Sequence, residues 1–224
     1  MEKRVFVIGD VHGCGHTLKE LVMNVCELQV TDTLYLLGDI IDRGPRIKFT
    51  VDFLLDLKKS GFDVNVVRGN HEQMLLDSIN QSKMLSHWFK NGGKDTLESF
   101  ELLNANYFDD IYFNFFMNLP FYYKTKEFVL VHSGLNFEIK DPFLDFKTML
   151  WSRDTNVKKE KIGGRRLITG HTPRSLETIK NSLSTDNIFL DGGCVYYKRI
   201  QGMGNLCAFE MNSKELFYLK NIDF

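Results

Sequence analysis

The chain has 224 residues, of which 43% are hydrophobic and 25% are charged, as is typical of a globular protein with a well-buried core. The formal net charge of -1 provides no overall positive field, which argues against binding to nucleic acid or to an anionic membrane. No apolar run approaches the roughly 18–20 residues that span a bilayer, and no signal peptide precedes the first apolar run. We therefore expect a cytoplasmic protein that binds neither nucleic acid nor membrane.

The first third of the chain alternates predicted strands and helices. Residues 4–8 form a short, nearly continuous apolar run, which is typical of a strand buried on both faces. Apolar residues at helical spacing follow at 18–25, and the pattern repeats as a strand at 33–37, a helix at 49–57 and a strand at 64–67. Alternation of this length predicts βαβ units and a parallel sheet.

The rest of the chain begins with a different composition. Residues 80–118 are rich in Asn, Phe and Leu, and they predict a helical insert beside the functional site. Within it, Trp88 and the pair Gly92–Gly93 fit either a pocket wall or a core aromatic beside a turn. The charged segment 158–166 predicts an exposed loop. Strands are expected again at residues 121–124, 128–131, 167–169, 188–190, 206–209 and 216–219.

The four cysteines, at positions 14, 26, 194 and 207, form no CxxC pair. We expect them to be reduced thiols rather than a disulfide framework. The chain contains no clear linker, repeat or low-complexity tract, which indicates a single domain over residues 1–224.

Five short motifs place Asp, Asn or His beside glycine. They are GDVHG at 9–13, GDIIDRG at 38–44, GNHE at 69–72, VHSG at 131–134 and GHTP at 170–173. At least four of them follow strand-forming runs. Because ligands in open parallel sheets bind outside the carboxyl ends of the strands, the motifs are expected to converge. The glycines lack a Cβ and allow sharp turns and close approach to metal or phosphate.

The side chains in these motifs form a mixed oxygen and nitrogen ligand set without cysteine. Such a set disfavours structural zinc and suits Mn²⁺, Fe or Zn²⁺ in an open catalytic site. Six ligands are too many for one catalytic metal, so two metals roughly 3.5–4 Å apart that share a bridging carboxylate are expected. A lone Asp or His at a strand end is more often a cap or a core residue, but five ordered motifs favour metal binding. The candidate ligands are Asp10, His12, Asp39, Asn70, His132 and His171, with Asp39 as the bridge.

In these motifs the chain resembles the calcineurin-like metallophosphoesterases, specifically the phosphoprotein phosphatase branch with its phage and bacterial serine/threonine phosphatases. The resemblance spans residues 9–173, and the Asp-Arg-Gly part of the second motif is its most specific piece. It implies an α/β fold containing βαβ units, with a central β-sandwich of mixed sheets flanked by helices. A second histidine is absent after His171, which favours phosphatases over phosphodiesterases. Glu72 stands where symmetric diadenosine tetraphosphatases tend to carry Asp.

The resemblance also implies roles for individual residues. Asp10 and His12 would bind the first metal and Asn70, His132 and His171 the second, with Asp39 shared. His71 would be the general acid, oriented by Asp42. Substrate contacts are expected from Arg43, Arg153 and Asn70.

These residues predict a metal-dependent phosphomonoesterase. Two divalent cations, Mn²⁺ in preference to Fe or Zn²⁺, would supply a bridging hydroxide that attacks phosphorus directly. His71 would protonate the leaving oxygen, while Arg43 and Arg153 would stabilise the charge on the phosphoryl group. The expected substrate is a phosphoserine or phosphothreonine protein or a small phosphate ester. The closest alternative is a diadenosine tetraphosphate hydrolase, ahead of a nuclease or a non-catalytic phosphate-binding module. No pattern indicates an oligomeric state.

Overall fold

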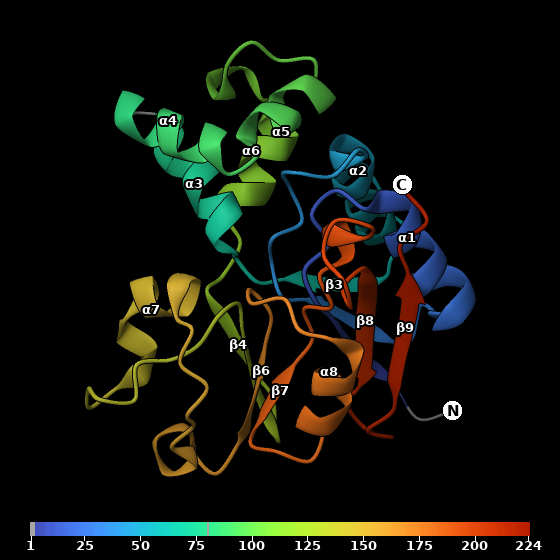
Figure 1. Ribbon diagram of the computed structural model, residues 1–224, viewed down its shortest axis with the longest axis vertical. Helices are drawn as coiled ribbons and strands as arrows, with labels where there is room; N and C mark the ends of the chain where they lie inside the picture. The colour runs from blue at the N-terminus through green and yellow to red at the C-terminus, as the bar shows by residue number, and fades with distance from the viewer. Residues whose placement is uncertain (1–2, 80) are drawn as a thin grey trace.

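Two β-sheets form the centre of the protein, seen here in a computed structural model that describes residues 3–79 and 81–224 (Figure 1). Met1, Glu2 and Asn80, which belong to the predicted domain and insert, lie outside the described residues. The sheet orders are β3-β2-β1-β8-β9 and β4-β5-β6-β7. The strands are β1 (Val5–Ile8), β2 (Thr33–Leu36), β3 (Asp63–Val66), β4 (Tyr122–Lys124), β5 (Phe128–Val131), β6 (Arg166–Thr169), β7 (Asn187–Phe189), β8 (Asn205–Glu210) and β9 (Leu216–Lys220).

Both sheets are mixed. Strands β1, β2 and β3 pair in parallel, as the βαβ pattern predicts, and β8 and β9 complete that sheet in antiparallel fashion. Strands β5, β6 and β7 also pair in parallel, with β4 antiparallel at the edge. The expected sandwich of mixed sheets is therefore confirmed.

Helices cover the outer faces of both sheets, and α4, α5 and α6 stand together at the top of Figure 1. The α-helices are α1 (Gly15–Glu20), α2 (Ile47–Lys59), α3 (Asn70–Ser78), α4 (Ser82–Lys90), α5 (Gly93–Ser99), α6 (Asp110–Met117), α7 (Phe146–Trp151) and α8 (Leu176–Ser182). A π-helical turn, η1 (Leu21–Val25), continues α1. The short 3₁₀ turns are η2 (Ala105–Tyr107), η3 (Pro142–Leu144), η4 (Lys159–Ile162) and η5 (Cys194–Tyr196).

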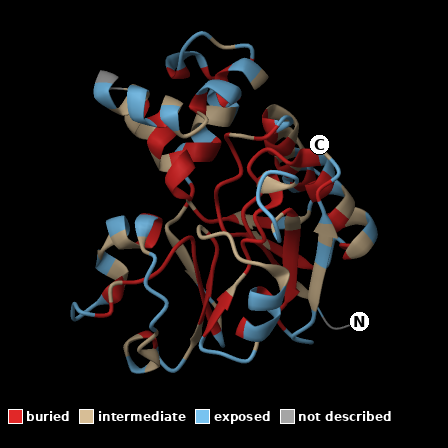
Figure 2. Ribbon diagram, in the orientation of Figure 1, coloured by how far each residue is buried: buried red, intermediate tan, exposed pale blue. Residues whose placement is uncertain are grey.

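Alternation along the strands divides the core into layers. Because successive side chains point to opposite faces, Val7 of β1 packs between the two sheets while Phe6 and Ile8 pack under the helices. In β5, Phe128 and Leu130 face the other sheet, whereas the intervening valines pack in the cluster on the outer side of the second sheet. Figure 2 shows that buried residues gather where the sheets meet. Strands β1 and β5 therefore bury both faces, as their nearly continuous apolar runs predict.

Two features of the fold differ from or refine the predictions. The segment 158–166 is not a plain exposed loop, because η4 turns Ile162 into the core, where it is 3% exposed. Helices α4, α5 and α6 lie within the segment predicted to be an insert, and Trp88 of α4 is fully buried. All four cysteines are buried free thiols.

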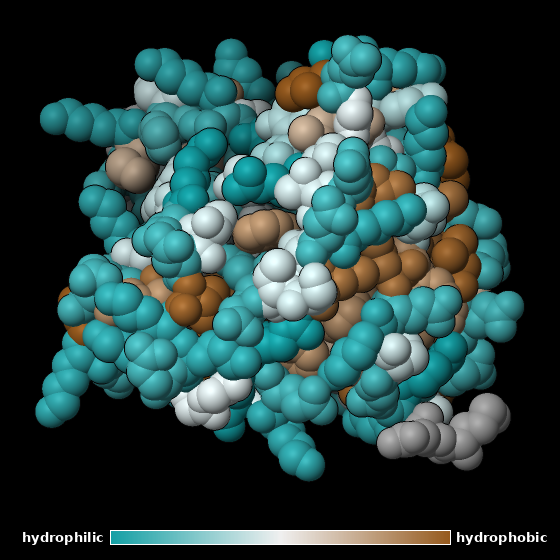
Figure 3. Space-filling view, turned by 60° about the horizontal axis from the view of Figure 1, so that its bottom comes forward, coloured by the Kyte–Doolittle hydropathy of each residue, from teal (hydrophilic) through white to brown (hydrophobic). Residues whose placement is uncertain are grey.

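The face of the protein shown in Figure 3 is largely hydrophilic, with apolar groups gathered toward the right of the view. Across the described residues, none of the helices combines the length and the apolar character needed to cross a membrane.

Candidate metal centre

The motif residues lie together because the parallel strands of both sheets end at one place. Asp10, Asp39 and Asn70 follow β1, β2 and β3, and His132 and His171 follow β5 and β6. Hydrogen bonds then tie the strand ends of the two sheets together. The backbone nitrogen of His171 donates to the Asp10 carboxylate at 3.0 Å, and Nδ1 of His132 lies 2.8 Å from the carbonyl oxygen of Leu37. The predicted convergence is therefore seen across both sheets.

The loops that carry the motifs are bent in an unusual way. Five of their non-glycine residues adopt the left-handed backbone region, with φ between 46° and 70°. Such conformations are costly for residues with a Cβ and persist where the surrounding structure imposes them, often at functional sites. The five residues are His12, Asp39, Asp42, Arg43 and His171.

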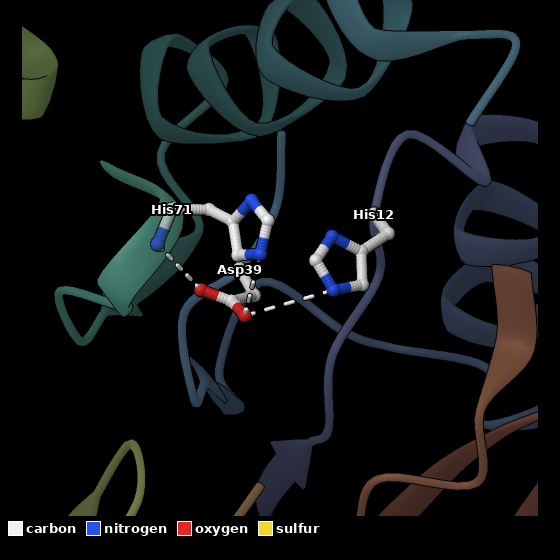
Figure 4. Close-up of side chains that lie close together, drawn as sticks. All are labelled: His12, Asp39 and His71. Carbon is white, nitrogen blue, oxygen red and sulfur yellow. Dashed lines mark hydrogen bonds and ion pairs between the residues drawn. The ribbon is translucent and has the colours of Figure 1, made fainter. Parts of the chain in front are cut away.

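The Asp39 carboxylate lies at the middle of the site (Figure 4). Its Oδ2 is 3.6 Å from Nε2 of His12, 3.9 Å from Nε2 of His71 and 3.4 Å from Nε2 of His132. Two groups of side chains able to hold a metal ion share this carboxylate: one with His12 and His71, and one with His132 and His171. Strand β2 lies between β1 and β3, so Asp39 has the central position expected of a shared ligand.

The second group fits a cation. Nδ1 of His132 faces a carbonyl oxygen and must donate, so its Nε2 is the atom directed at the site, 2.8 Å from Oδ1 of Asn70 and 3.2 Å from Nδ1 of His171. Nε2 of His171 is buried without a hydrogen-bond partner. Burial disfavours a charged His132, yet Asp39 outweighs burial and raises the pKa of His132 to about 10. The surroundings of Nε2 therefore favour a positive charge, which is carried by a proton on His132 or, in its place, by a divalent metal.

In the first group, the unprotonated Nε2 of His12 lies beside the guanidinium of Arg43. Nδ1 of His12 donates to the Ile41 carbonyl oxygen at 2.9 Å, the contact typical of a metal-binding imidazole, which orients Nε2 into the site. Nη1 of Arg43 lies 2.7 Å from that same Nε2. Because Nε2 has one lone pair, a metal at His12 and this hydrogen bond exclude each other.

Asp10 lies beside both groups but belongs to neither. Its carboxylate accepts from the His171 backbone, and burial together with the neighbouring Asp191 raises the pKa of Asp10 well above its ordinary range. The structure instead brings His71 into the first group with His12. The assignment of Asp10 to the first metal stays a prediction.

His71 and Asp42 form a buried pair. Nδ1 of His71 lies 2.5 Å from Oδ2 of Asp42, and both side chains are at most 1% exposed. Burial lowers the pKa of His71 to about 3 and raises the pKa of Asp42 well above its usual range. Both shifts disfavour charge, and the short contact between Nδ1 and Oδ2 requires one proton between the two atoms. Nε2 of His71 faces Asp39.

A cavity of about 130 Å³ opens over the centre. Arg43, Arg153, Asn70 and His71 line it, while Asp42 and His132 lie in the walls beneath. A larger hollow of about 500 Å³ elsewhere contains none of the motif residues and is unrelated to this chemistry. The other residues around the cavity are His12, Asp39, Asn91, Trp151, His171, Pro173, Asp191 and Tyr196.

Four residues outside the predicted ligand and catalytic set also shape the site. Trp88 and Thr96 of the insert donate hydrogen bonds to the Asp42 carboxylate. Glu72 accepts backbone hydrogen bonds from the second and third motifs. Asp191, after β7, is 3% exposed and lines the cavity, and burial raises its pKa to about 6. Asp191 follows an apolar run as the other strand-end residues do, Glu72 lies in the third motif and Trp88 was a candidate pocket residue, whereas Thr96 carried no signal in the sequence.

Comparison with known proteins agrees with this geometry. The model of the calcineurin-like phosphoesterase family matches residues 3–198. The chain belongs to this family. It is 29% identical over 208 residues to serine/threonine-protein phosphatase 1 of Salmonella typhimurium, covering 87% of this chain and 88% of that protein.

A second kind of relative matches part of the chain. The symmetrical bis(5'-nucleosyl)-tetraphosphatase of Proteus mirabilis is 33% identical over 132 residues, which is 58% of this chain and 44% of that protein. Among solved structures, a diadenosine tetraphosphatase candidate aligns with a TM-score of 0.63 at 19% identity, over 99% of this chain and 95% of that one. A serine/threonine phosphatase from Saccharomyces cerevisiae aligns with a TM-score of 0.59 at 16% identity, over 98% of this chain and 80% of that one. These two likenesses show the fold.

Proposed function

We propose that the protein is a metal-dependent phosphomonoesterase that acts on phosphoserine or phosphothreonine in proteins. The observation that carries the proposal is the position of Asp39 between two groups of imidazole ligands, under a cavity lined by two arginines. Asp10, His12, Asp39, Asn70, His132 and His171 would hold two metals, with Mn²⁺ the first choice for this ligand set. When bound, the metals would lower the pKa of a coordinated water and neutralise phosphate charge.

The remaining residues then have separate tasks. The guanidinium groups of Arg43 and Arg153 can each donate paired hydrogen bonds to phosphate oxygens, which holds the phosphoryl group and offsets its charge. His71 lines the cavity and would deliver the proton on Nε2 to the leaving oxygen, while Asp42 holds Nδ1. The leaving alcohol of phosphoserine is a poor leaving group, so this proton matters for the proposed substrate.

The share of each relative that the chain matches supports the proposal of a protein phosphatase. The match to the Salmonella typhimurium phosphatase spans 88% of that protein, whereas the match to the Proteus mirabilis tetraphosphatase spans 44% of it. The second candidate, hydrolysis of diadenosine tetraphosphate, is supported by the higher identity of 33% in the part that does match. Both reactions would use the same metal centre.

A substrate panel tests the proposal. Purified protein loaded with Mn²⁺, Fe²⁺ or Zn²⁺ is given phosphoserine and phosphothreonine peptides, diadenosine tetraphosphate and p-nitrophenyl phosphate. The proposal expects the highest kcat/KM on a phosphopeptide. Higher kcat/KM on diadenosine tetraphosphate would establish the second candidate. No turnover with any metal would contradict both.

A further inference from the structure

The helical insert makes direct contacts with the Asp42–His71 pair. The Asp42 carboxylate accepts from Nε1 of Trp88, which lies 3.1 Å from Oδ1 and 2.9 Å from Oδ2, and from the hydroxyl of Thr96. Trp88 lies near the C-terminal end of α4, and Thr96 lies in α5. Trp88, Thr96 and Asp42 are each fully buried, so water does not compete for these hydrogen bonds.

These contacts fix the direction of the carboxylate. Its two oxygens receive donors from the indole, the hydroxyl and the imidazole of His71, and the Thr96 hydroxyl also accepts from the Asp42 backbone nitrogen at 3.1 Å. The carboxylate cannot rotate without breaking at least one of these bonds. Since Asp42 in turn holds Nδ1 of His71, the insert sets the direction in which Nε2 of His71 points.

The turn between α4 and α5 also packs against the second motif. A Cβ on Gly92 would lie 2.9 Å from the backbone nitrogen and 2.9 Å from Cγ of Arg43, and the φ of Gly92 is +106°. The neighbouring Asn91 lines the cavity. The turn between α4 and α5 therefore contacts the residues around the metal centre directly.

We propose that Trp88 and Thr96 are positioning residues for proton delivery by His71, and that this support is the role of the insert in the reaction. The inference rests on the proposed function, because it requires His71 to protonate the leaving oxygen. In that step the oxygen of a water molecule, having given up a proton, bonds to phosphorus as the P–O bond to the leaving group breaks. The electron pair of the broken bond stays on the leaving oxygen, which takes the proton from Nε2 of His71. Misplacing the imidazole should harm poor leaving groups and spare good ones.

The test uses Thr96→Val, which removes the hydroxyl with little change of shape, and Trp88→Phe, which removes the indole donor and keeps an aromatic ring. Thr96→Ser, which keeps the hydroxyl, is the conservative variant. Leu97→Val is the matched control, because Leu97 is buried in the same helix and packs in the core. Each variant is assayed with a phosphoserine peptide and with p-nitrophenyl phosphate, and its metal content and thermal unfolding are measured.

Thr96→Val and Trp88→Phe should each lower kcat/KM for the phosphoserine peptide about 30-fold, which is less than the 10²–10⁴-fold that a general acid contributes in full, and leave p-nitrophenyl phosphate nearly unaffected. Thr96→Ser should retain activity on both, and Leu97→Val should change both substrates equally. Metal content should not change. Equal loss on the two substrates, or no loss, in Thr96→Val and Trp88→Phe overturns the inference.

His71→Asn separates this inference from the proposed function. If His71→Asn shows no dependence on the leaving group, the general-acid assignment fails and the inference fails with it. If His71→Asn shows the dependence and the insert variants do not, only the inference fails. NMR of the Nδ1 proton of His71 in protein loaded with diamagnetic Zn²⁺ gives a second readout: its chemical shift should move in Thr96→Val and Trp88→Phe and stay unchanged in Leu97→Val. An unchanged shift in all variants contradicts the inference, whether or not one insert variant folds poorly.

Discussion

The Glu72 carboxylate accepts a hydrogen bond from the backbone nitrogen of Asp39 at 2.9 Å, and this contact joins the second and third motifs. The same carboxylate accepts from the backbone nitrogens of Ile40 and Gly69, each at 2.9 Å. Glu72 is fully buried and does not line the cavity. Glu72 therefore holds the loop that carries Asp39, and it does not contact the space where a substrate would bind.

Glu72→Gln should therefore destabilise the protein without changing its substrate preference. Losing an acceptor that serves several buried N–H groups should lower the free energy of unfolding by about 2–3 kcal/mol, since buried donors would be left unpaired. Chemical denaturation measures this loss. Glu72→Asp, whose shorter side chain cannot span the same donors, should also be destabilised and should keep the ratio of activities on phosphopeptide and diadenosine tetraphosphate. A shift of that ratio toward the dinucleotide would show that position 72 selects the substrate.

Asp39→Asn should weaken metal binding in both groups, because the carboxylate lies in each. Removing its negative charge takes away the attraction common to both cations, so activity should be lost. Metal content and calorimetric titration with Mn²⁺ measure the binding. His171→Ala is the comparison, because it removes a ligand from one group and should cost one metal per chain. Full occupancy by two metals in Asp39→Asn would contradict the shared position of Asp39.

Arg43→Ala should have opposite effects on catalysis and metal binding. Loss of the guanidinium should lower kcat/KM roughly 10²–10³-fold, as removal of one donor to transition-state charge typically does. The metal affinity at His12 should rise, because Nε2 no longer has Arg43 2.7 Å away. Arg153→Ala is the control: it should lower turnover without strengthening metal binding, since Arg153 is exposed and has no contact with His12. Unchanged metal affinity in Arg43→Ala would contradict the competition.

Asp32 should contribute a pH-dependent part of the stability. Burial favours the protonated form, but hydrogen bonds from Arg4, with Nη2 at 2.6 Å, and from the backbone of Gln29 outweigh it and lower the pKa of Asp32. A lowered folded pKa means stability that is present above the unfolded value of about 3.9 and lost as the pH falls through the folded value.

Urea denaturation between pH 7 and pH 2.5 measures this contribution. The wild type should be more stable than Asp32→Asn near neutrality, and the difference should shrink below about pH 4. Asp186→Asn is the control, because Asp186 is half exposed in a surface pair with Lys159 and should contribute little at any pH. A difference between wild type and Asp32→Asn that persists at pH 2.5 would contradict the assignment.

Gly69→Ala should disrupt the site. A Cβ there would lie 2.2 Å from Oδ1 and 2.4 Å from the backbone nitrogen of Asp39, so the loop must move. Metal binding should be lost or the protein should fail to fold. Gly61→Ala is the matched comparison: Gly61 has φ +89° and open space around its position, so only backbone strain of about 1 kcal/mol is expected. Normal metal binding by Gly69→Ala would contradict the close approach.

The sequence predicted most of the fold and the candidate ligands for one physical reason. Each of Asp10, Asp39 and His132 follows a short apolar run, and such runs form strands because successive side chains bury both faces. Parallel strands bring their carboxyl ends to one edge, so local patterns are enough to predict that the motifs meet. The same local reasoning was wrong at Ile162, where a single apolar residue turns a charged segment inward.

The sequence by itself predicted which residues would carry the chemistry, and the tertiary structure shows how those residues are held. Trp88 and Thr96 reach Asp42 across 46 and 54 positions, and Glu72 reaches Asp39 across 33. No periodicity encodes such a pairing, because it depends on how α3, α4 and α5 pack against the second motif. The contact between Arg43 and Nε2 of His12 is also visible only in the tertiary structure. Both residues adopt left-handed backbone conformations, which their residue types do not predict.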